Sequence, residues 1–407
     1  MAITVYNTPA SYAPAYNQMI FTLSSTNVTQ PNFRYIADIY VNGSSDYTRL
    51  EVGRNPTNSS GVFDISGIVQ NYLFRDAEDN TNAFKTCGNS IVSYEVKFGE
   101  QYGASSGITN YTNLTTRTGY AYNGVFDPLT FLDYTKNKYS LFNSSSKFLT
   151  DCPNILTRVG EKLNIGYLVQ NTGQTFLEIK VYTVTGTLQK TVKLQSPFDY
   201  SNVAEYSLNA NISYDFLNSL VTGDLYEGTA PIFNASSSYY TIQMLYSDEP
   251  PTYSAVSEIK RITIDEYCSK YDPIRFKFMN NYGKYDYYTF TGAKTKNTNI
   301  KRNTYKSNPN EWSGVNYNYS RMSRGLNQYE TILDDTITIN SDWITEAESV
   351  WLEQLVTSPD VYIYEGSNLV SVNITNSSYE TKYEASQQLF NLVISFTYSQ
   401  NRKRQRR

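Results

Sequence analysis

The chain has 407 residues, and its 40% hydrophobic and 15% aromatic content supports hydrophobic cores in two or three domains. Charged residues make up only 18%, with a formal net charge of -4, which excludes a disordered chain and a generally basic nucleic-acid binder. The chain contains no His, so Ser-His-Asp and Cys-His catalysis in their usual form and the commonest metal ligand are also excluded.

The N-terminal stretch MAITVYNTPASYAPAYN has neither the basic segment nor the apolar core of a signal peptide. No apolar run approaches the ~18 residues that a membrane-spanning helix needs. These features predict a soluble protein that is made in a cytoplasm and makes no membrane insertion.

Alternating apolar and polar residues predict antiparallel strands along the whole chain. The apolar faces consist of Phe33, Tyr35, Ala37, Ile39 and Val41; Val92, Tyr94, Val96 and Phe98; Leu177, Ile179 and Val181, which continue through a Thr185-Gly186 turn to Leu188, Val192 and Leu194; Tyr240, Ile242, Met244 and Tyr246; and Phe390, Leu392, Ile394, Phe396 and Tyr398. The predicted fold class is all-β, with two or three antiparallel β-sandwich or barrel-like units.

The stretch IRFKFMNNYGKYDYYTF, residues 274–290, predicts a β-hairpin with many rings. Ile274, Phe276 and Phe278 alternate with Arg275 and Lys277, which predicts one apolar and one basic face. The Asn- and Gly-rich turn interrupts the pattern, and the rings are explained most simply by packing within a sheet.

Few helices are expected, and the clearest covers residues 345–356. Thr345 and Glu348 have the spacing of a capping box, and Pro359 ends the helix. Ala347, Trp351 and Leu355 are predicted to line its apolar face. Two GVFD stretches, at residues 61–64 and 124–127, predict Asp-capped turns before shorter helices.

Polar stretches at residues 142–153 and 247–254 suggest boundaries. We predict a β-rich domain over 1–145, a β-sandwich-like domain over 150–268, and a β-rich domain over 269–407 with one helix and a basic tail. The three cysteines Cys87, Cys152 and Cys268 are far apart in the sequence and are expected to be free, buried thiols.

No motif for enzymatic chemistry or cofactor binding was found. The chain lacks phosphate-binding Gly-rich loops of the Walker or dinucleotide type. The pair Asp334-Asp335 could serve a glycosidase only at a separation that the sequence does not give. We therefore expect a protein that is not an enzyme and binds neither cofactor nor metal.

Two basic segments are the candidate interaction surface. Residues 270–306 include nine basic residues and only two acidic ones, and five more basic residues lie at the C-terminus. They are Lys270, Arg275, Lys277, Lys284, Lys294, Lys296, Lys301, Arg302 and Lys306, followed by Arg402, Lys403, Arg404, Arg406 and Arg407. Three interpretations remain open: a solvated strand face, a contact with acidic surfaces of neighbouring subunits, or non-specific DNA contact through phosphates and stacking.

Several stretches resemble virion structural proteins of tailed phages that infect Bacteroidetes, including crAss-like phages. They are QPNFRYIADIYVNG, NPTNSSGVFDISGIVQNYL, SKFLTDCP, YDPIRFKFMNNYGKYDYYTF, KRNTYKS, ITEAESVWLEQLVTSPDVYIYEG and FNLVISFTYSQNRKRQRR. The resemblance spans most of the chain and implies a non-enzymatic component of the neck or connector, tail or baseplate.

The resemblance also implies assembly in the host bacterial cytoplasm into a symmetric ring in the virion. The partners would be other copies of the chain and other phage tail or neck proteins. The alternative is a receptor-binding or fibre-type adhesin that stacks exposed aromatic rings on host-surface glycans. Long repeats and coiled-coil heptads, which are typical of fibres, are absent from the sequence.

Overall fold

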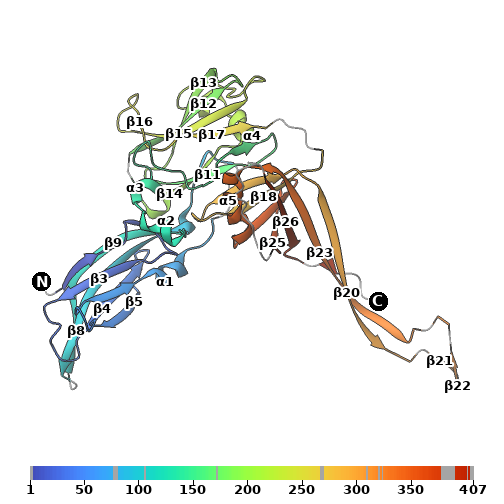
Figure 1. Ribbon diagram of the computed structural model, residues 1–407, viewed down its shortest axis with the longest axis horizontal. Coiled ribbons are helices and arrows are strands. Elements are labelled where there is room, and N and C mark those ends of the chain that lie inside the picture. Colours follow the sequence, from blue (N-terminus) through green and yellow to red (C-terminus); the bar gives the residue numbers. More distant parts are fainter. Residues whose placement is uncertain are drawn as a thin grey trace. The chain divides into compact units, whose positions relative to one another are not determined.

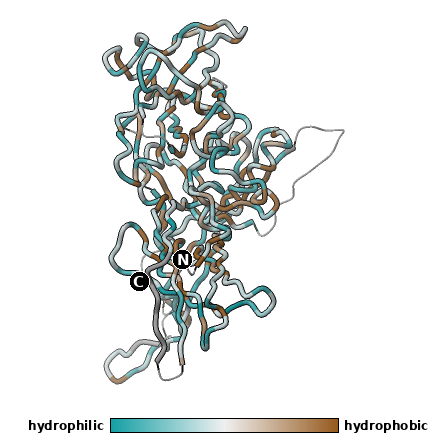
Figure 2. Tube along the Cα trace, turned by 90° about the vertical axis from the view of Figure 1, so that its left-hand side faces the viewer, coloured by the Kyte–Doolittle hydropathy of each residue, from teal (hydrophilic) through white to brown (hydrophobic). Residues whose placement is uncertain are grey.

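The structure is a computed structural model that describes residues 3–76, 81–104, 107–170, 173–265, 270–308, 310–319, 321–322, 324–376, 390–400 and 402–403. It is 49% strand and 12% helix, so the protein is all-β, as predicted (Figure 1). Hydrophobic and hydrophilic residues are interspersed along the chain (Figure 2). Among the described residues, no helix is long and apolar enough to cross a membrane.

The chain forms two compact units. Unit 1 contains residues 1–267 together with Met279–Asp286, and unit 2 contains Cys268–Phe278 and Tyr287–Arg407. The predicted boundary near residue 268 therefore agrees with a boundary between units. The predicted boundary near 145–150 does not, because both flanking regions belong to unit 1.

The first part of unit 1 is a sandwich of two sheets. One sheet has the order β1-β3-β6 and the other the order β2-β9-β8-β4-β5. Their strands are β1 (Ile3–Asn7), β3 (Ile20–Ser25) and β6 (Gly61–Asp64), and β2 (Tyr12–Pro14), β9 (Gly107–Tyr122), β8 (Ile91–Ala104), β4 (Arg34–Val41) and β5 (Tyr47–Gly53). Phe21 and Phe63 from the first sheet share a buried core with Phe98 and the apolar face of β4.

The second part of unit 1 contains two further sheets, with the orders β11-β14-β7 and β10-β17-β15-β12-β13; β16 pairs with β15. The strands are β11 (Asn164–Leu168), β14 (Ser207–Asn211), β7 (Phe84–Thr86), β10 (Ile155–Thr157), β17 (Lys260–Ile264), β15 (Tyr239–Ser247), β12 (Gln174–Tyr182), β13 (Leu188–Gln195) and β16 (Ser254–Ala255). The predicted hairpin is confirmed, because Leu177 pairs with Leu194 and Ile179 with Val192. Gly186 in its turn has a φ of 82°, which favours glycine.

Two features join these parts into one unit. Strand β7 comes from the first predicted domain but pairs with β14 of the second. An aromatic core is also shared: Tyr12 and Phe126 belong to the first region, and Leu149 and Leu168 to the second. Tyr282, from the turn of the aromatic hairpin, packs in the same core with its ring 5.4 Å from Phe126. The regions on both sides of residue 150 therefore belong to one compact unit.

Unit 2 is built on a sheet of the order β19-β18-β24-β25-β26-β23-β20, and β27 also pairs with β23. The strands are β18 (Ile274–Met279), β19 (Tyr285–Phe290), β20 (Lys294–Lys306), β23 (Leu326–Ile344), β24 (Val361–Glu365), β25 (Asn368–Ile374), β26 (Phe390–Tyr398) and β27 (Arg402–Lys403); a separate hairpin pairs β21 (Asn310–Ser313) with β22 (Asn316–Tyr319).

Helix α5 (Glu346–Thr357) confirms the clearest helical prediction. The Thr345 hydroxyl accepts a hydrogen bond from the Glu348 backbone N–H, and the Glu348 carboxylate accepts one from the Thr345 N–H at 2.8 Å. Trp351 is only 3% exposed and packs 5.6 Å from Phe278. The predicted place of Ala347 on the buried face was wrong: it is exposed, and Leu352 is buried beside Trp351 instead.

The other helices are short. They are α1 (Ser66–Val69), α2 (Pro128–Leu132), α3 (Lys136–Tyr139) and α4 (Tyr214–Ser219), with 3-10 turns at Gln70–Tyr72, Gly88–Ser90, Val203–Tyr206 and Thr222–Asp224. Asp127 caps α2, as predicted. Asp64 is not the N-cap of α1, which is Ile65, but its carboxylate accepts a hydrogen bond from the Ser66 backbone N–H at the start of that helix. Cys87 and Cys152 are free and buried, as expected, whereas Cys268 lies outside the described residues.

Candidate functional site

Three of the nine basic residues predicted on an interaction surface are buried, and the prediction was wrong for them. Arg275, Lys277 and Lys284 are 7%, 3% and 3% exposed. Strand β18 lies inside the sheet of unit 2, where β19 and β24 pair with its two edges. Its consecutive residues 275–278 are all buried, so both of its faces are covered as well. Its alternating pattern does not separate an apolar face from a solvent face.

Each buried cation has a structural contact. The Arg275 guanidinium donates a hydrogen bond to the Thr289 hydroxyl at 2.9 Å. The Lys284 ammonium is enclosed within unit 1 and donates to the hydroxyls of Ser207 at 2.7 Å and Ser90 at 3.1 Å. The Lys277 ammonium lies 5.9 Å from the centre of the Tyr362 ring. These groups are enclosed in the fold and are not available to a partner.

The other six members of the first basic segment are exposed: Lys270, Lys294, Lys296, Lys301, Arg302 and Lys306. Five of them lie on β20, an edge strand of the sheet. Lys294 and Lys296 form ion pairs near the start of β20, with Asp272 at 3.5 Å and Asp335 at 3.0 Å. Within the described part of the chain, Lys301, Arg302 and Lys306 form no ion pair.

Strand pairing brings the two predicted basic segments together. Ile332 on β23 pairs with Lys301 of β20 on one side and with Lys403 of β27 on the other. Leu333 pairs in the same way with Ile300 and Arg402. The remaining predicted tail residues, Arg404, Arg406 and Arg407, lie outside the described residues.

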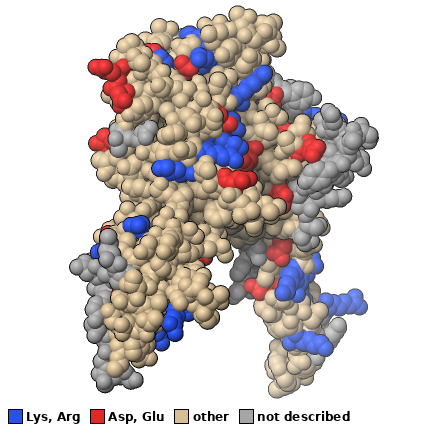
Figure 3. Space-filling model, turned by 60° about the vertical axis from the view of Figure 1, so that its left-hand side comes forward, with Lys and Arg blue, Asp and Glu red and all other residues tan. Residues whose placement is uncertain are grey.

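Beyond this row, β20 and β23 continue as a two-stranded ribbon. We call residues 300–333 the arm; it contains the β21–β22 hairpin (Figure 1). Between the row of Arg302 and Thr331 and the row of Lys306 and Leu326, no further described strand pairs with either side of the ribbon. Lys and Arg side chains stand out on the exposed surface of the arm in Figure 3.

The arm also exposes large apolar side chains, which the sequence interpretation missed. They are Ile300, Tyr305, Trp312, Val315, Tyr317, Met322, Leu326 and Tyr329. Trp312 and Val315, at 73% and 92% exposed, lie at the end of the arm, where Gly314-Val315 connects β21 to β22. Gly314 has a φ of 62°, so its Ser-Gly dipeptide was a usable turn signal. We call residues 312–318, all of them exposed, the arm tip.

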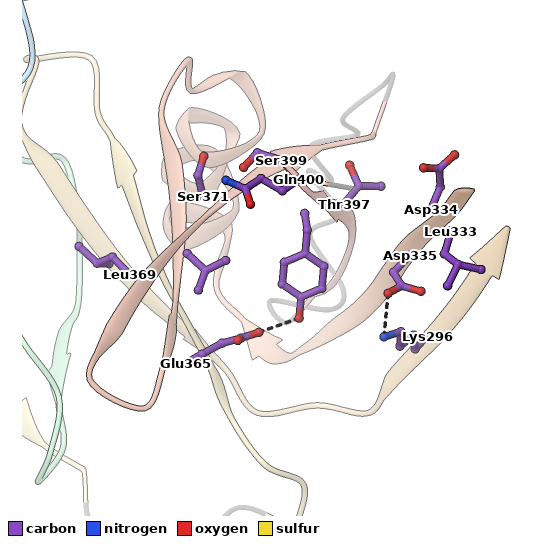
Figure 4. A pocket seen from close by; sticks show the side chains of 12 residues that line it. Lys296, Leu333, Asp334, Asp335, Glu365, Leu369, Ser371, Thr397, Ser399 and Gln400 are labelled. Atoms are coloured by element: carbon purple, nitrogen blue, oxygen red, sulfur yellow. Dashed lines mark hydrogen bonds and ion pairs between the residues drawn. The ribbon is translucent and has the colours of Figure 1, made fainter. Parts of the chain in front are cut away.

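A pocket of 750 Å³ lies in unit 2 beside the first residues of the arm. Its lining comes from β20, β23, β24, β25 and the end of β26 and consists of Lys296, Leu333, Asp334, Asp335, Glu365, Leu369, Val370, Ser371, Thr397, Tyr398, Ser399 and Gln400. The lining therefore includes three acidic residues and one lysine. Figure 4 shows the Lys296–Asp335 pair on one side of the pocket and Glu365 on the other.

The three carboxylates differ in how they are held. Asp335 is buried and accepts a hydrogen bond from Thr298 at 2.6 Å in addition to its ion pair with Lys296. Glu365 accepts a hydrogen bond from the Tyr398 hydroxyl at 2.7 Å. Asp334 has one buried oxygen, Oδ1, without a hydrogen-bond partner in the described structure. Neither Asp334 nor Glu365 pairs with a basic side chain among the described residues.

This arrangement gives little support to glycosidase chemistry. Asp334 and Asp335 are consecutive strand residues, and Figure 4 shows their side chains pointing in opposite directions from β23. The Asp335 carboxylate also forms an ion pair with Lys296 and accepts a hydrogen bond from Thr298. The chemistry that the region does offer is recognition, through an exposed ribbon with basic and aromatic groups and a pocket with acidic ones.

No protein-family model and no curated protein matches the chain.

Proposed function

We propose that this protein is a non-enzymatic structural subunit of a tailed bacteriophage virion, in the neck, tail or baseplate, and that the arm makes contacts between subunits. The observation that carries the proposal is the arm itself. An isolated two-stranded ribbon is at best marginally stable in water. A chain that exposes such a ribbon together with eight large apolar side chains is suited to cover it with a protein partner.

The composition of the arm favours protein over DNA as that partner. Tyr, Trp, Met and Arg are enriched in the cores of protein interfaces, and all four are exposed on the arm. Two acidic residues, Glu311 and Glu330, interrupt its basic charge. The proposal that this assembly is a phage particle rests on the resemblance of the sequence to virion structural proteins.

The test replaces residues 301–332 with a four-residue Gly-containing turn. Ile300 and Leu333 are opposite each other in the register, so the shortened hairpin can close without moving the rest of the sheet. We expect the variant to keep a circular dichroism spectrum of the β type, reduced by the strands that were removed, but to lose self-association in sedimentation velocity and incorporation into phage particles. Normal incorporation and an unchanged oligomeric state would refute the assembly function.

The second candidate is a glycan-binding adhesin, and two exposed rings favour it. Trp312 and Trp343 are 73% and 69% exposed, whereas Trp351 is buried and unavailable for stacking on a sugar. An adhesin of this kind should bind host-surface glycans, and Trp312→Ala or Trp343→Ala should weaken that binding. Failure of the intact protein to bind host polysaccharide would reject the adhesin.

A further inference from the structure

We propose that the arm tip of one copy occupies the acidic pocket in unit 2 of a second copy. This inference rests on the proposed assembly function and specifies its partner and its contact. It is argued from the chemistry of the two surfaces and from the position of the pocket relative to the arm.

The charges of the two surfaces are complementary. Lys306, Arg321 and Arg324 lie next to the arm tip, are exposed, and have no acidic partner among the described residues. Asp334 and Glu365 at the pocket likewise have no basic partner there. The N–H groups of a guanidinium lie in one plane and can donate two parallel hydrogen bonds to a carboxylate. Arg321 or Arg324 of one copy can therefore pair with Glu365, which is exposed at the rim of the pocket of another copy.

The apolar parts also match. Trp312 and Val315 are the most exposed apolar side chains of the tip, and Leu333, Leu369 and Val370 line the pocket. A volume of 750 Å³ lies within the range of about 300–1,000 Å³ that is usual for pockets that bind small molecules. It can therefore receive a few side chains from the end of a hairpin. Binding energy in protein interfaces is often concentrated in a few buried aromatic or Arg side chains near the centre of the contact.

The structure holds the arm tip away from the pocket of the same copy. Leu333 lines the pocket, and the paired ribbon runs from there to Leu326, seven residues away on β23. At about 3.3 Å per residue, the ribbon carries its end some 23 Å from the pocket before β21 and β22 begin. Both complementary surfaces are therefore present on every copy, and in this arm geometry they meet between copies.

A contact of this kind is heterologous, because different surfaces of the two copies meet. Repetition of one heterologous contact gives a ring when the rotation closes and a filament when it does not. The inferred contact is thus of the type that the proposed ring requires, and it needs no third protein.

Cysteine cross-linking tests the contact directly. Val315→Cys on the tip and Ser371→Cys at the pocket are both at exposed positions. Full-length proteins carrying one substitution each, one of them enlarged by a fused tag, are mixed and oxidised. We expect a disulfide-linked heterodimer at a yield at least five times that obtained when Ser44→Cys, an exposed loop position in unit 1, replaces Ser371→Cys.

A charge exchange adds specificity. Glu365→Lys in the Ser371→Cys protein should lower the heterodimer yield, and Arg324→Glu in the Val315→Cys partner should restore part of it. Asp46→Lys, an exposed reversal in unit 1, should leave the yield unchanged. A yield no higher than that of the Ser44→Cys control, while deletion of the arm still abolishes self-association, would overturn the pocket as the docking site and leave the assembly function standing. If deletion of the arm also has no effect, both proposals fall.

Discussion

Replacement of Trp351 by Ala should severely destabilise unit 2. The indole is 3% exposed, and its ring lies 5.6 Å from Phe278 and 6.0 Å from Tyr288. Burial of a Trp removes about 200 Å² from water, and at about 25 cal/mol per Å² this contributes roughly 5 kcal/mol as an upper value. Large-to-small substitutions at such sites cost about 3–5 kcal/mol, and loss of two aromatic contacts favours the upper half of that range.

Scanning calorimetry of the full chain measures this effect. For a unit of this size, 1 kcal/mol corresponds to a shift in Tm of about 4 °C, so a loss of about 4–5 kcal/mol should lower the transition of unit 2 by about 16–20 °C. Val350→Ala is the matched control, because Val350 precedes Trp351 on α5 but is 46% exposed; it should shift Tm by less than about 4 °C. A Trp351→Ala protein that melts within about 2 °C of the native protein would refute the packing of α5 on the sheet.

Three further outcomes are expected. Thr345→Ala removes the capping hydroxyl of α5 and should cost about 1 kcal/mol in urea unfolding, whereas Thr345→Ser should cost little. Gly283→Ala should destabilise unit 1 by more than about 1 kcal/mol, because φ is 70° and a Cβ would lie 1.8 Å from the Asn123 carbonyl oxygen; equal urea midpoints would contradict this. Burial, together with the Asp151 carboxylate, raises the pKa of Tyr282 well above its ordinary value of 10.0. The contribution of the neutral Tyr282 side chain to stability is therefore complete below pH 10 and is lost as the pH rises further. Tyr282→Phe should reduce the loss of stability between about pH 10 and 11.5, as measured by urea unfolding at each pH.

The local structure was predictable where one residue pattern had one physical meaning. The apolar face of β4 is buried as its period-2 alternation requires, and the Thr345–Glu348 spacing produces the predicted capping box. In both cases the signal lies within a dozen residues. Neither depends on which other part of the chain packs against it.

The site was harder to predict because strand order is not a local property. Arg275 and Lys277 alternate with apolar residues as they would on a half-exposed strand, but β18 lies between two other strands and its second face is covered. Lys284 follows the turn of the aromatic hairpin and belongs to unit 1. Its ammonium donates hydrogen bonds to two hydroxyls that lie far away in the sequence. Basic composition alone could not separate these residues from those on the arm.

The arm itself left a weak sequence signal for a physical reason. Residues of β20 are polar on both faces, since most of the strand is solvent-exposed, so the periodicity that identifies half-buried strands is missing. The exposed apolar residues are spread over β20, the β21–β22 hairpin and β23, and only the pairing register brings them onto one ribbon.

The Lys residues of β20 have a second possible function besides docking. Natural proteins place Lys on exposed edge strands to prevent edge-to-edge aggregation, and β20 is such an edge. That function explains Lys294, Lys296, Lys301 and Lys306, but it gives no reason to expose Trp312 and Val315 at the end of the same ribbon. Protection of an edge favours polar tips, because an exposed Trp adds the aggregation risk that the lysines reduce. Lysines along the ribbon and apolar residues at its tip are both explained if they have different functions. The lysines prevent non-specific strand pairing along the ribbon, and the apolar tip binds one acidic and apolar pocket.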